Sequence, residues 1–276
     1  MTHPTAPPPN TDPPDSGVMA RLLARAAALQ LHGLIEHSDE LDEPWRIHVA
    51  QLLDWEEDVR RQRGLERRLG AAHLGKFKPL ADFDWAWPAS IDRAGVNTLM
   101  ALGFMDTATN VILVGPNGVG KSTLAQNLAH RAVLAGHSAR FVTAARMLND
   151  LAAQDGASAL ERRLRYYARP ELLVLDELGY LAYGNRHADL LFEIVNRRYE
   201  RHATIITTNR PFGEWSEVFP NAPCVVSIVD RLVHHSEIIV IEGDSYRMHE
   251  AKTRAGRKKP VARSRRKPDP DTGAAA

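Results

Sequence analysis

The chain has 276 residues, of which 44% are hydrophobic and 25% are charged, a composition typical of a soluble globular protein with one or two domains. It contains one cysteine, Cys224, so a disulfide within the chain is excluded and a reducing, cytoplasmic compartment is favoured. No apolar run approaches the roughly 20 residues that cross a bilayer, and the proline-rich N-terminus lacks the apolar segment of a signal peptide. We therefore expect no membrane association.

The net charge of +1 conceals two regions of opposite charge. Residues 251–276 contain nine Lys or Arg and two Asp, a net charge of +7, so the remaining 26 basic and 32 acidic residues give −6. The tail has almost no apolar residues, which predicts disorder. It is either a solvated tail or a segment that contacts nucleic-acid phosphates without reading their sequence.

The N-terminal part predicts a small helical domain at residues 18–75, after a disordered, proline-rich leader at residues 1–17. Apolar residues recur at helical spacing from Val18 to Ile35, which indicates one amphipathic helix. The run Asp42-Glu43-Pro44 indicates the start of a second helix.

The second predicted helix has an arginine-rich half, which makes it a candidate DNA-binding surface. Its arginines are Arg60, Arg61, Arg63, Arg67 and Arg68. Glu56 and Glu57 precede them, so part of this charge is alternatively explained by i,i+4 pairing on a solvated face. The other interpretation is contact with a DNA backbone or a partner.

Residues 76–109 are interpreted as a linker that packs on the following domain. Periodicity is lost here, and the aromatic residues Phe77, Phe83, Trp85 and Trp87 cluster near two prolines. Plain packing explains these aromatics better than stacking on an adenine base, for which the sequence offers no support.

The segment Gly115-Pro-Asn-Gly-Val-Gly-Lys-Ser122 matches G-x-x-x-x-G-K-[ST], the pattern of a phosphate-binding loop. It lies between a β-branched run, Val111–Val114, and a stretch with helical periodicity, which is the context such a loop requires. Glycines allow close approach of phosphate oxygens, the lysine neutralises the β- and γ-phosphates, and the serine hydroxyl can ligate Mg²⁺. The predicted ATP-binding residues are Gly115, Pro116, Asn117, Gly118, Val119, Gly120, Lys121, Ser122 and Thr123.

Strand-like and helix-like stretches alternate from Asn110 onward, which predicts a parallel sheet covered on both faces. The expected strands are Val111–Val114, Arg140–Thr143, Leu172–Leu175, Thr204–Thr207 and Ile238–Ile241. The expected helices lie near Ser122–Leu134, Arg146–Ala168 (as one or two helices) and Ala188–Arg201. Ligands of such sheets bind beyond the carboxyl ends of the strands, where Gly115 lies.

Two carboxylates, Asp176 and Glu177, follow the apolar run Leu172–Leu175. We expect Asp176 to hold Mg²⁺ through its hydration shell and Glu177 to act as general base on the attacking water. Adjacent acids at a strand end also occur as ordinary solvated residues. Their place about 55 residues after a phosphate-binding loop favours the catalytic interpretation.

Four further residues, Asn209, Arg231, His234 and His235, carry weaker signals. Asn209 follows an apolar strand and can bind the water or the γ-phosphate, although Asn after a strand is usually a turn residue. Arg231 can stabilise a transferring phosphoryl group from a neighbouring subunit, or else form an ion pair with Asp230 or Glu237. His234 and the histidine after it have no metal-ligand spacing and are interpreted as packing or surface residues.

Together these residues resemble the IstB-like ATP-binding proteins, helpers of insertion-sequence transposition that are related to DnaC helicase loaders and, more distantly, to DnaA, all of the AAA+ class. The resemblance runs from about Met19 to Met248. The phosphate-binding loop alone indicates only a nucleoside triphosphatase, whereas the later blocks in this order are much more specific. The blocks are Gly115–Ser122, Leu175–Tyr180, Thr208–Trp215 with Phe219, Asp230–Leu232 with His235, and Gly243–Arg247.

The resemblance implies an AAA+ domain at residues 110–250 with a five-stranded parallel sheet in the order 5-1-4-3-2 and no C-terminal lid. It implies that Asn209 is the sensor 1 residue and that Arg231 is an arginine finger. It further implies ATP-dependent homo-oligomers that bind and bend double-stranded DNA and activate a transposase of the IstA type. The alternatives are a DnaC-like helicase loader and a nucleotide-binding scaffold without useful hydrolysis; intact Asp176, Glu177 and Arg231 argue against the scaffold.

Overall fold

The chain divides into two compact units, with the division at Gly70 and Ala71. The computed structural model describes residues 14–180, 184–219 and 222–250. The predicted basic tail and all but the last four residues of the predicted leader lie outside these ranges. Those last four residues belong to a helix that begins at Pro14, so the predicted leader is too long at this end.

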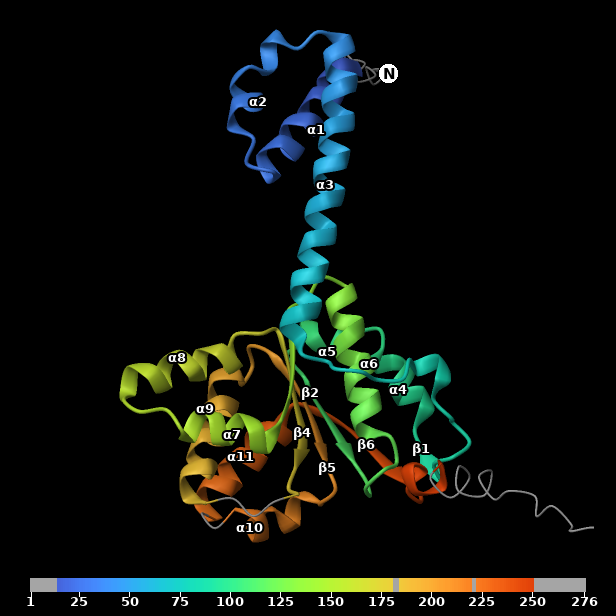
Figure 1. Cartoon of the computed structure of the whole chain (residues 1–276), viewed down its shortest axis with the longest axis vertical. Helices are drawn as coiled ribbons and strands as arrows, with labels where there is room; N and C mark the ends of the chain where they lie inside the picture. The colour runs from blue at the N-terminus through green and yellow to red at the C-terminus, as the bar shows by residue number, and fades with distance from the viewer. Residues whose placement is uncertain (1–13, 181–183, 220–221, 251–276) are drawn as a thin grey trace, which may run out of the picture. The chain divides into compact units, whose positions relative to one another are not determined.

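The first unit is helical (Figure 1). Its elements are α1 (Pro14–Ala28), α2 (His32–Glu36), the 3₁₀ turn η1 (Ser38–Glu40) and α3 (Glu43–Ala72), whose last two residues belong to the second unit.

The prediction of one continuous helix from Val18 to Ile35 is wrong. The chain stops α1 with the paired bonds of a Schellman motif: the Leu31 N–H donates to the Ala26 carbonyl at 2.9 Å, and the Gln30 N–H to the Ala27 carbonyl at 3.0 Å. Gln30 takes the left-handed conformation this stop requires, with φ of 58°.

The start of α3 agrees with the predicted signal. The Asp42 carboxylate accepts the Trp45 N–H at 3.0 Å, which satisfies one of the free donors of the first turn. The helices of this unit enclose a small apolar core of Leu22, Leu29, Val49 and Leu53.

The second unit contains one mixed sheet of six strands in the order β1-β6-β2-β5-β4-β3. The strands are β1 (Ser90–Ile91), β2 (Asn110–Val114), β3 (Ala139–Thr143), β4 (Leu172–Leu178), β5 (Ala203–Thr208) and β6 (Ser236–Glu242). The prediction of five parallel strands in the order 5-1-4-3-2 is wrong for the sheet as a whole, because β1 pairs antiparallel with β6 and adds a sixth strand. Without β1 the remaining strands are parallel and run β6-β2-β5-β4-β3.

Helices cover both faces of this sheet, which explains why its central strands are continuous apolar runs (Figure 1). Helix α6 lies on one face, and α7, α9 and α11 lie on the other. The bounds of the helices and helical turns are η2 (Leu80–Asp82), α4 (Arg93–Leu99), α5 (Gly103–Asp106), α6 (Lys121–Leu134), α7 (Ala144–Ala152), α8 (Ala157–Ala168), α9 (Asn185–Arg198), η3 (Phe212–Glu214), α10 (Trp215–Val218) and α11 (Ala222–His234).

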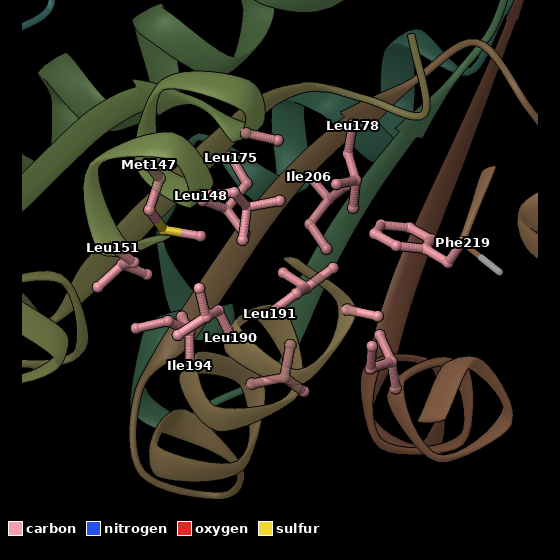
Figure 2. Close-up of a cluster of buried hydrophobic side chains, with 14 of the residues drawn as sticks. Met147, Leu148, Leu151, Leu175, Leu178, Leu190, Leu191, Ile194, Ile206 and Phe219 are labelled. Carbon is pink, nitrogen blue, oxygen red and sulfur yellow. The ribbon is translucent and has the colours of Figure 1, made fainter. Parts of the chain in front are cut away.

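The larger core lies between the sheet and the helices α7, α9 and α11. Figure 2 shows Leu175 and Ile206 of the sheet facing Leu148, Leu191 and neighbouring apolar side chains of the helices. These side chains are fully buried, and removing a leucine from such a core costs about 2–5 kcal/mol. This packing holds the carboxyl ends of the strands, and therefore the candidate site, in a fixed arrangement.

Arg198, at the end of α9, is a buried charge with a structural role. It is 2% exposed and donates to the carbonyls of Ala168 at 2.8 Å, Pro170 at 2.6 Å and Ala203 at 2.5 Å. Burial lowers its pKa. These bonds join the start of β4 to the start of β5, at the end of the sheet opposite the candidate site. None of the described helices is long and apolar enough to cross a bilayer.

Candidate functional site

The loop between β2 and α6 has the backbone geometry of a phosphate-binding site. Gly118 and Gly120 have φ of 84° and 103°, values that side chains with a Cβ rarely adopt. A Cβ on Gly120 would lie 2.6 Å from Cε2 of Phe83, and one on Gly118 would lie 2.2 Å from Oγ of Ser245. Conformation and packing therefore both require glycine. The loop leads into the N-terminus of α6, whose free N–H groups and dipole favour an anion.

Lys121, the first residue of α6, lies against this loop. Its side chain is 5% exposed, and its Nζ donates to the carbonyls of Gly115 at 2.6 Å and Pro116 at 2.7 Å. Burial lowers the Lys121 pKa to about 8, although the nearby Asp176 carboxylate opposes this shift. The ammonium group is thus held at the loop by two neutral carbonyl acceptors. Anionic phosphate oxygens can replace these carbonyls as its hydrogen-bond acceptors.

Asp176 joins the loop region to two strands of the sheet. Its Oδ1 accepts hydrogen bonds from the Ser122 hydroxyl at 2.8 Å and from the Thr207 hydroxyl at 2.6 Å. A hydroxyl and a carboxylate at this separation are the oxygen ligands that Mg²⁺ takes beside nucleotide phosphates. The residues present therefore fit a magnesium ion bound with ATP.

Glu177 has an irregular backbone that directs its side chain to the same cavity as Ser122. The register between β4 and β5 shifts between Leu175 and Leu178, and Glu177 has φ of 60°. Its N–H donates to Thr207 Oγ1 at 2.9 Å, which supports this strained conformation. In a regular strand two successive side chains would point to opposite faces, so the irregularity lets adjacent acids serve one site.

A cavity of about 530 Å³ opens beside the loop. Gly118, Val119, Gly120, Lys121, Ser122 and Thr123 line it, together with Glu177. Gly115, Pro116, Asn117 and the buried Asp176 are not among the lining residues. The Asn117 side chain accepts a hydrogen bond from the Tyr180 hydroxyl.

Part of the lining of the cavity is aromatic, which the sequence did not predict. It consists of Phe77, Phe83, Trp87 and Tyr246. The prediction that the linker aromatics pack on the next domain agrees with these positions. These side chains also line the cavity, which the prediction did not include. Such flat apolar faces beside a phosphate-binding loop can hold a nucleotide base.

The segment at 243–250 contributes three residues to the lining of the cavity, Tyr246, Arg247 and Glu250, and was missed as a functional element. The Tyr246 N–H donates to the Gly118 carbonyl at 3.0 Å, and Trp87 Nε1 donates to the Asp244 carbonyl at 2.8 Å. Arg247 lines the cavity and is one of the charges that lower the Lys121 pKa. The only signal for these residues was the motif Gly243–Arg247, to which the sequence assigns no role.

Asn209 and Arg231 lie outside the lining of the cavity within the described residues. The Asn209 side-chain oxygen is buried and has no hydrogen-bond partner in the described part of the chain. Arg231 donates to Asn196 Oδ1 at 2.6 Å and lies 4.7 Å from the centroid of the Phe192 ring. The alternative prediction, an ion pair of Arg231 with Asp230 or Glu237, is not seen in the described residues.

The five candidate DNA-binding arginines differ in their environments. Arg60 pairs with Glu56 at 2.6 Å and Arg61 with Asp58 at 2.9 Å, so i,i+4 and i,i+3 pairing accounts for part of the charge. Arg63 and Arg67 are exposed and form no ion pair within the described chain, and Arg68 is half-buried. The charges of Arg60 and Arg61 are therefore partly neutralised. Contact of this surface with DNA stays a prediction.

His234 and His235 are exposed, as expected for surface residues, and each offers a ring nitrogen near the Glu200 carboxylate. The three ligand atoms lie within 4.8 Å of one another, an arrangement that the spacing in sequence did not predict.

Comparison with known proteins agrees with this geometry. The family model of the IstB-like ATP-binding proteins matches residues 23–255. The chain is 38% identical over 239 residues to the ATP-binding protein of insertion sequence IS21 from Pseudomonas aeruginosa, covering 87% of this chain and 90% of the relative. It is 33% identical over 211 residues to the corresponding protein of IS5376 from Geobacillus stearothermophilus, covering 76% of this chain and 84% of that one.

The fold is similar to that of a solved DnaA protein. The structure of DnaA from Aquifex aeolicus bound to AMPPCP matches with a TM-score of 0.52 at 20% identity, covering 67% of this chain and 56% of that one. This likeness concerns the fold alone. The family match and the identities decide the classification: the chain belongs to the family of IstB-like ATP-binding proteins.

Proposed function

We propose that this protein is an ATPase that assembles on double-stranded DNA and assists a transposase of the IstA type. The observation that carries the ATPase part is that Lys121, Ser122 and Glu177 line one cavity beside a glycine loop, with Asp176 hydrogen-bonded to Ser122. A protein that only stored nucleotide would need the cradle and the lysine. It would not need a strained Glu177 directed at the same cavity.

Each residue has a distinct part in hydrolysis. Lys121 exchanges its two carbonyl partners for phosphate oxygens. The Ser122 hydroxyl and the Asp176 carboxylate would hold Mg²⁺, which would neutralise charge at the phosphates. The Glu177 carboxylate takes the proton of the attacking water. Asn209 is assigned to orienting that water by the resemblance alone, because its side chain does not line the cavity in the described structure.

Arg231 completes the site of a neighbouring subunit. It is held in place by Asn196 and by the Phe192 ring, away from the cavity of its own chain. A guanidinium group prepared in this way can reach a phosphoryl group only across an interface between copies. ATP binding thereby becomes coupled to assembly, because each bound nucleotide offers anionic charge to the next subunit.

The DNA and transposase parts rest on the family and on charge. Relatives with 38% and 33% identity are ATP-binding proteins of insertion sequences, which favours a role in transposition over one in helicase loading. Exposed Arg63 and Arg67 offer cationic groups for a DNA backbone. Because the body of the chain is acidic, we expect local contacts with a steep dependence on salt.

One experiment tests these parts together. The full-length chain is mixed with duplex DNA and either ATP with Mg²⁺ or no nucleotide, and electron microscopy and sedimentation report the assemblies. We expect DNA-bound oligomers with ATP in the wild type and none with Lys121→Ala. Equal assembly with ATP and without nucleotide would overturn the proposal that ATP controls assembly. Stimulation of a replicative helicase, with no effect on a transposase encoded beside this chain, would assign the protein to helicase loading instead.

A further inference from the structure

A second cavity, which we call the β3 pocket, lies beside the edge strand β3 of the second unit. It has a volume of about 200 Å³, several times the ~30 Å³ that one water molecule occupies, and residues of β3, α7 and α8 form it together with His73. Among the described residues it shares no lining residue with the nucleotide cavity. The nucleotide site therefore does not explain it.

Arg140 is the buried cation of the β3 pocket. It is 9% exposed, its Nε is buried without a hydrogen-bond partner, and it forms no ion pair within the described chain. Its guanidinium lies 3.7 Å from the centroid of the Tyr166 ring, which holds the group flat against an aromatic face but offers no acceptor oxygen. A buried charge without an acceptor is costly, so an acceptor from outside the chain would stabilise this arrangement.

The one acid in the described lining does not neutralise Arg140. The Asp150 carboxylate is engaged by Arg163, whose Nε donates at 2.5 Å, and by the Tyr167 hydroxyl, which donates to the same oxygen at 2.5 Å. Arg146, on the first turn of α7, is exposed and likewise forms no ion pair within the described residues. Three arginines and one aspartate leave the pocket with a net charge of +2, without counting His73.

We propose that the β3 pocket binds a phosphate group. Guanidinium donors match the oxygens of phosphate in a fork geometry. A free hydrogen phosphate ion carries two negative charges, which equals the excess of the pocket, and each phosphodiester of a nucleic-acid backbone carries one. The group has two possible sources, a free phosphate ion or the backbone of a nucleic acid. Only the second source rests on the DNA binding proposed above, and the pocket stands without it.

The first test uses inorganic phosphate and the full-length chain. Arg140→Gln and Arg146→Gln remove a cation of the pocket, and Arg162→Gln removes an exposed arginine of α8 outside the lining. The thermal midpoint is compared in phosphate and in chloride at equal ionic strength. If the source is a free ion, phosphate raises the midpoint of the wild type and of Arg162→Gln, and most of this rise is lost in the pocket variants. Should Arg140→Gln fail to fold, the exposed Arg146→Gln decides the result.

The second test uses a short fluorescent duplex and the same variants. If the source is a DNA backbone, Arg146→Gln weakens binding regardless of sequence and reduces the slope of log affinity against log salt by about 1, whereas Arg162→Gln leaves it unchanged. A loss in either test supports the pocket and identifies its source.

Equal phosphate effects and equal duplex slopes in the pocket variants and in Arg162→Gln would overturn the proposal. Loss of self-association in Arg146→Gln, with both phosphate tests unchanged, would also overturn it and would assign the pocket to a carboxylate of a second copy. ATP binding, measured on every variant, separates this outcome from failure of the ATPase proposal. The β3 pocket variants should bind ATP normally because their side chains do not line the nucleotide cavity.

Discussion

The Ser122 hydroxyl donates a hydrogen bond of 2.8 Å to Oδ1 of Asp176, and this bond connects the first turn of α6 with β4. The Thr207 hydroxyl donates to the same oxygen at 2.6 Å from the neighbouring strand β5. Three elements are thereby tied together at the point where Mg²⁺ and the phosphates would bind. The site is thus preorganised around Ser122 and Asp176, the two side chains that we propose as ligands of Mg²⁺.

Asp176→Asn should remove the dependence of ATP affinity on Mg²⁺, because an amide oxygen is a weak replacement for a carboxylate. We expect hydrolysis to fall by about 10–100-fold or more, the range seen when groups that support a metal are lost. Titration of ATP with Mg²⁺ and with a chelator measures the effect. Asp189→Asn, an exposed acid of α9, is the matched control and should behave as the wild type. Undiminished Mg²⁺ dependence would remove Asp176 from the metal site.

Glu177→Gln should keep ATP bound and slow its hydrolysis by about 10²–10⁴-fold, the usual contribution of a general base. The amide retains the size of the side chain and leaves the bond from the Glu177 N–H to Thr207 unchanged. Single-turnover hydrolysis with labelled ATP separates chemistry from binding. Glu237→Gln, an exposed acid of β6, serves as control. A wild-type rate in the first variant would show that another group activates the water.

The parts of the site that the sequence predicts are those built from contiguous residues. The glycines and Lys121 occupy one loop, and Asp176 follows one apolar run, so local spacing is enough to find them. The aromatic wall brings Phe83 next to Gly120, and Tyr246 next to Gly118, across long separations in sequence. No local pattern encodes such contacts.

The errors in the predicted fold have similar causes. Strand β1 has two residues, which is too short for a periodicity, and it exists because Ser90 and Ile91 pair with β6. The break after α1 depends on a left-handed residue that is Gln30 where Gly or Asn would have been recognised. In both β1 and the break after α1, tertiary packing outweighs weak local preferences of the sequence.

The affinity for ATP should fall as the pH rises through about 8. Lys121 has an ordinary pKa of 10.5 that burial lowers to about 8 in the folded chain, so its positive charge is present below that pH and lost above it. Phosphate oxygens stabilise the charged form, which means that binding above this pH takes up a proton. If only the charged lysine binds, affinity declines up to about tenfold per pH unit there.

Calorimetry in two buffers of different ionisation enthalpy measures this proton uptake with a non-hydrolysable ATP analogue. Lys78→Ala removes an exposed lysine of the same cavity and should keep the pH dependence, because Lys121 is intact. The same linkage acts on folding. Between about pH 8 and 10.5 the unfolded chain holds a proton that the folded chain has released, so stability gains from this group as the pH rises. A constant ATP affinity across pH 8 would contradict the assignment.

Arg231→Ala should bind ATP and lose about 10³–10⁵-fold in hydrolysis, the range known for arginines that act on a neighbouring site. Mixing it with Lys121→Ala distinguishes action in trans from damage within the chain. In a mixed oligomer the intact Lys121 of one subunit binds ATP, and the intact Arg231 of the other can reach it, so activity should return. Arg201→Ala, an exposed arginine near the end of α9, controls for loss of charge. If verified mixed oligomers stay inactive, Arg231 acts through Asn196 and Phe192 on its own fold, because these are its partners in the chain.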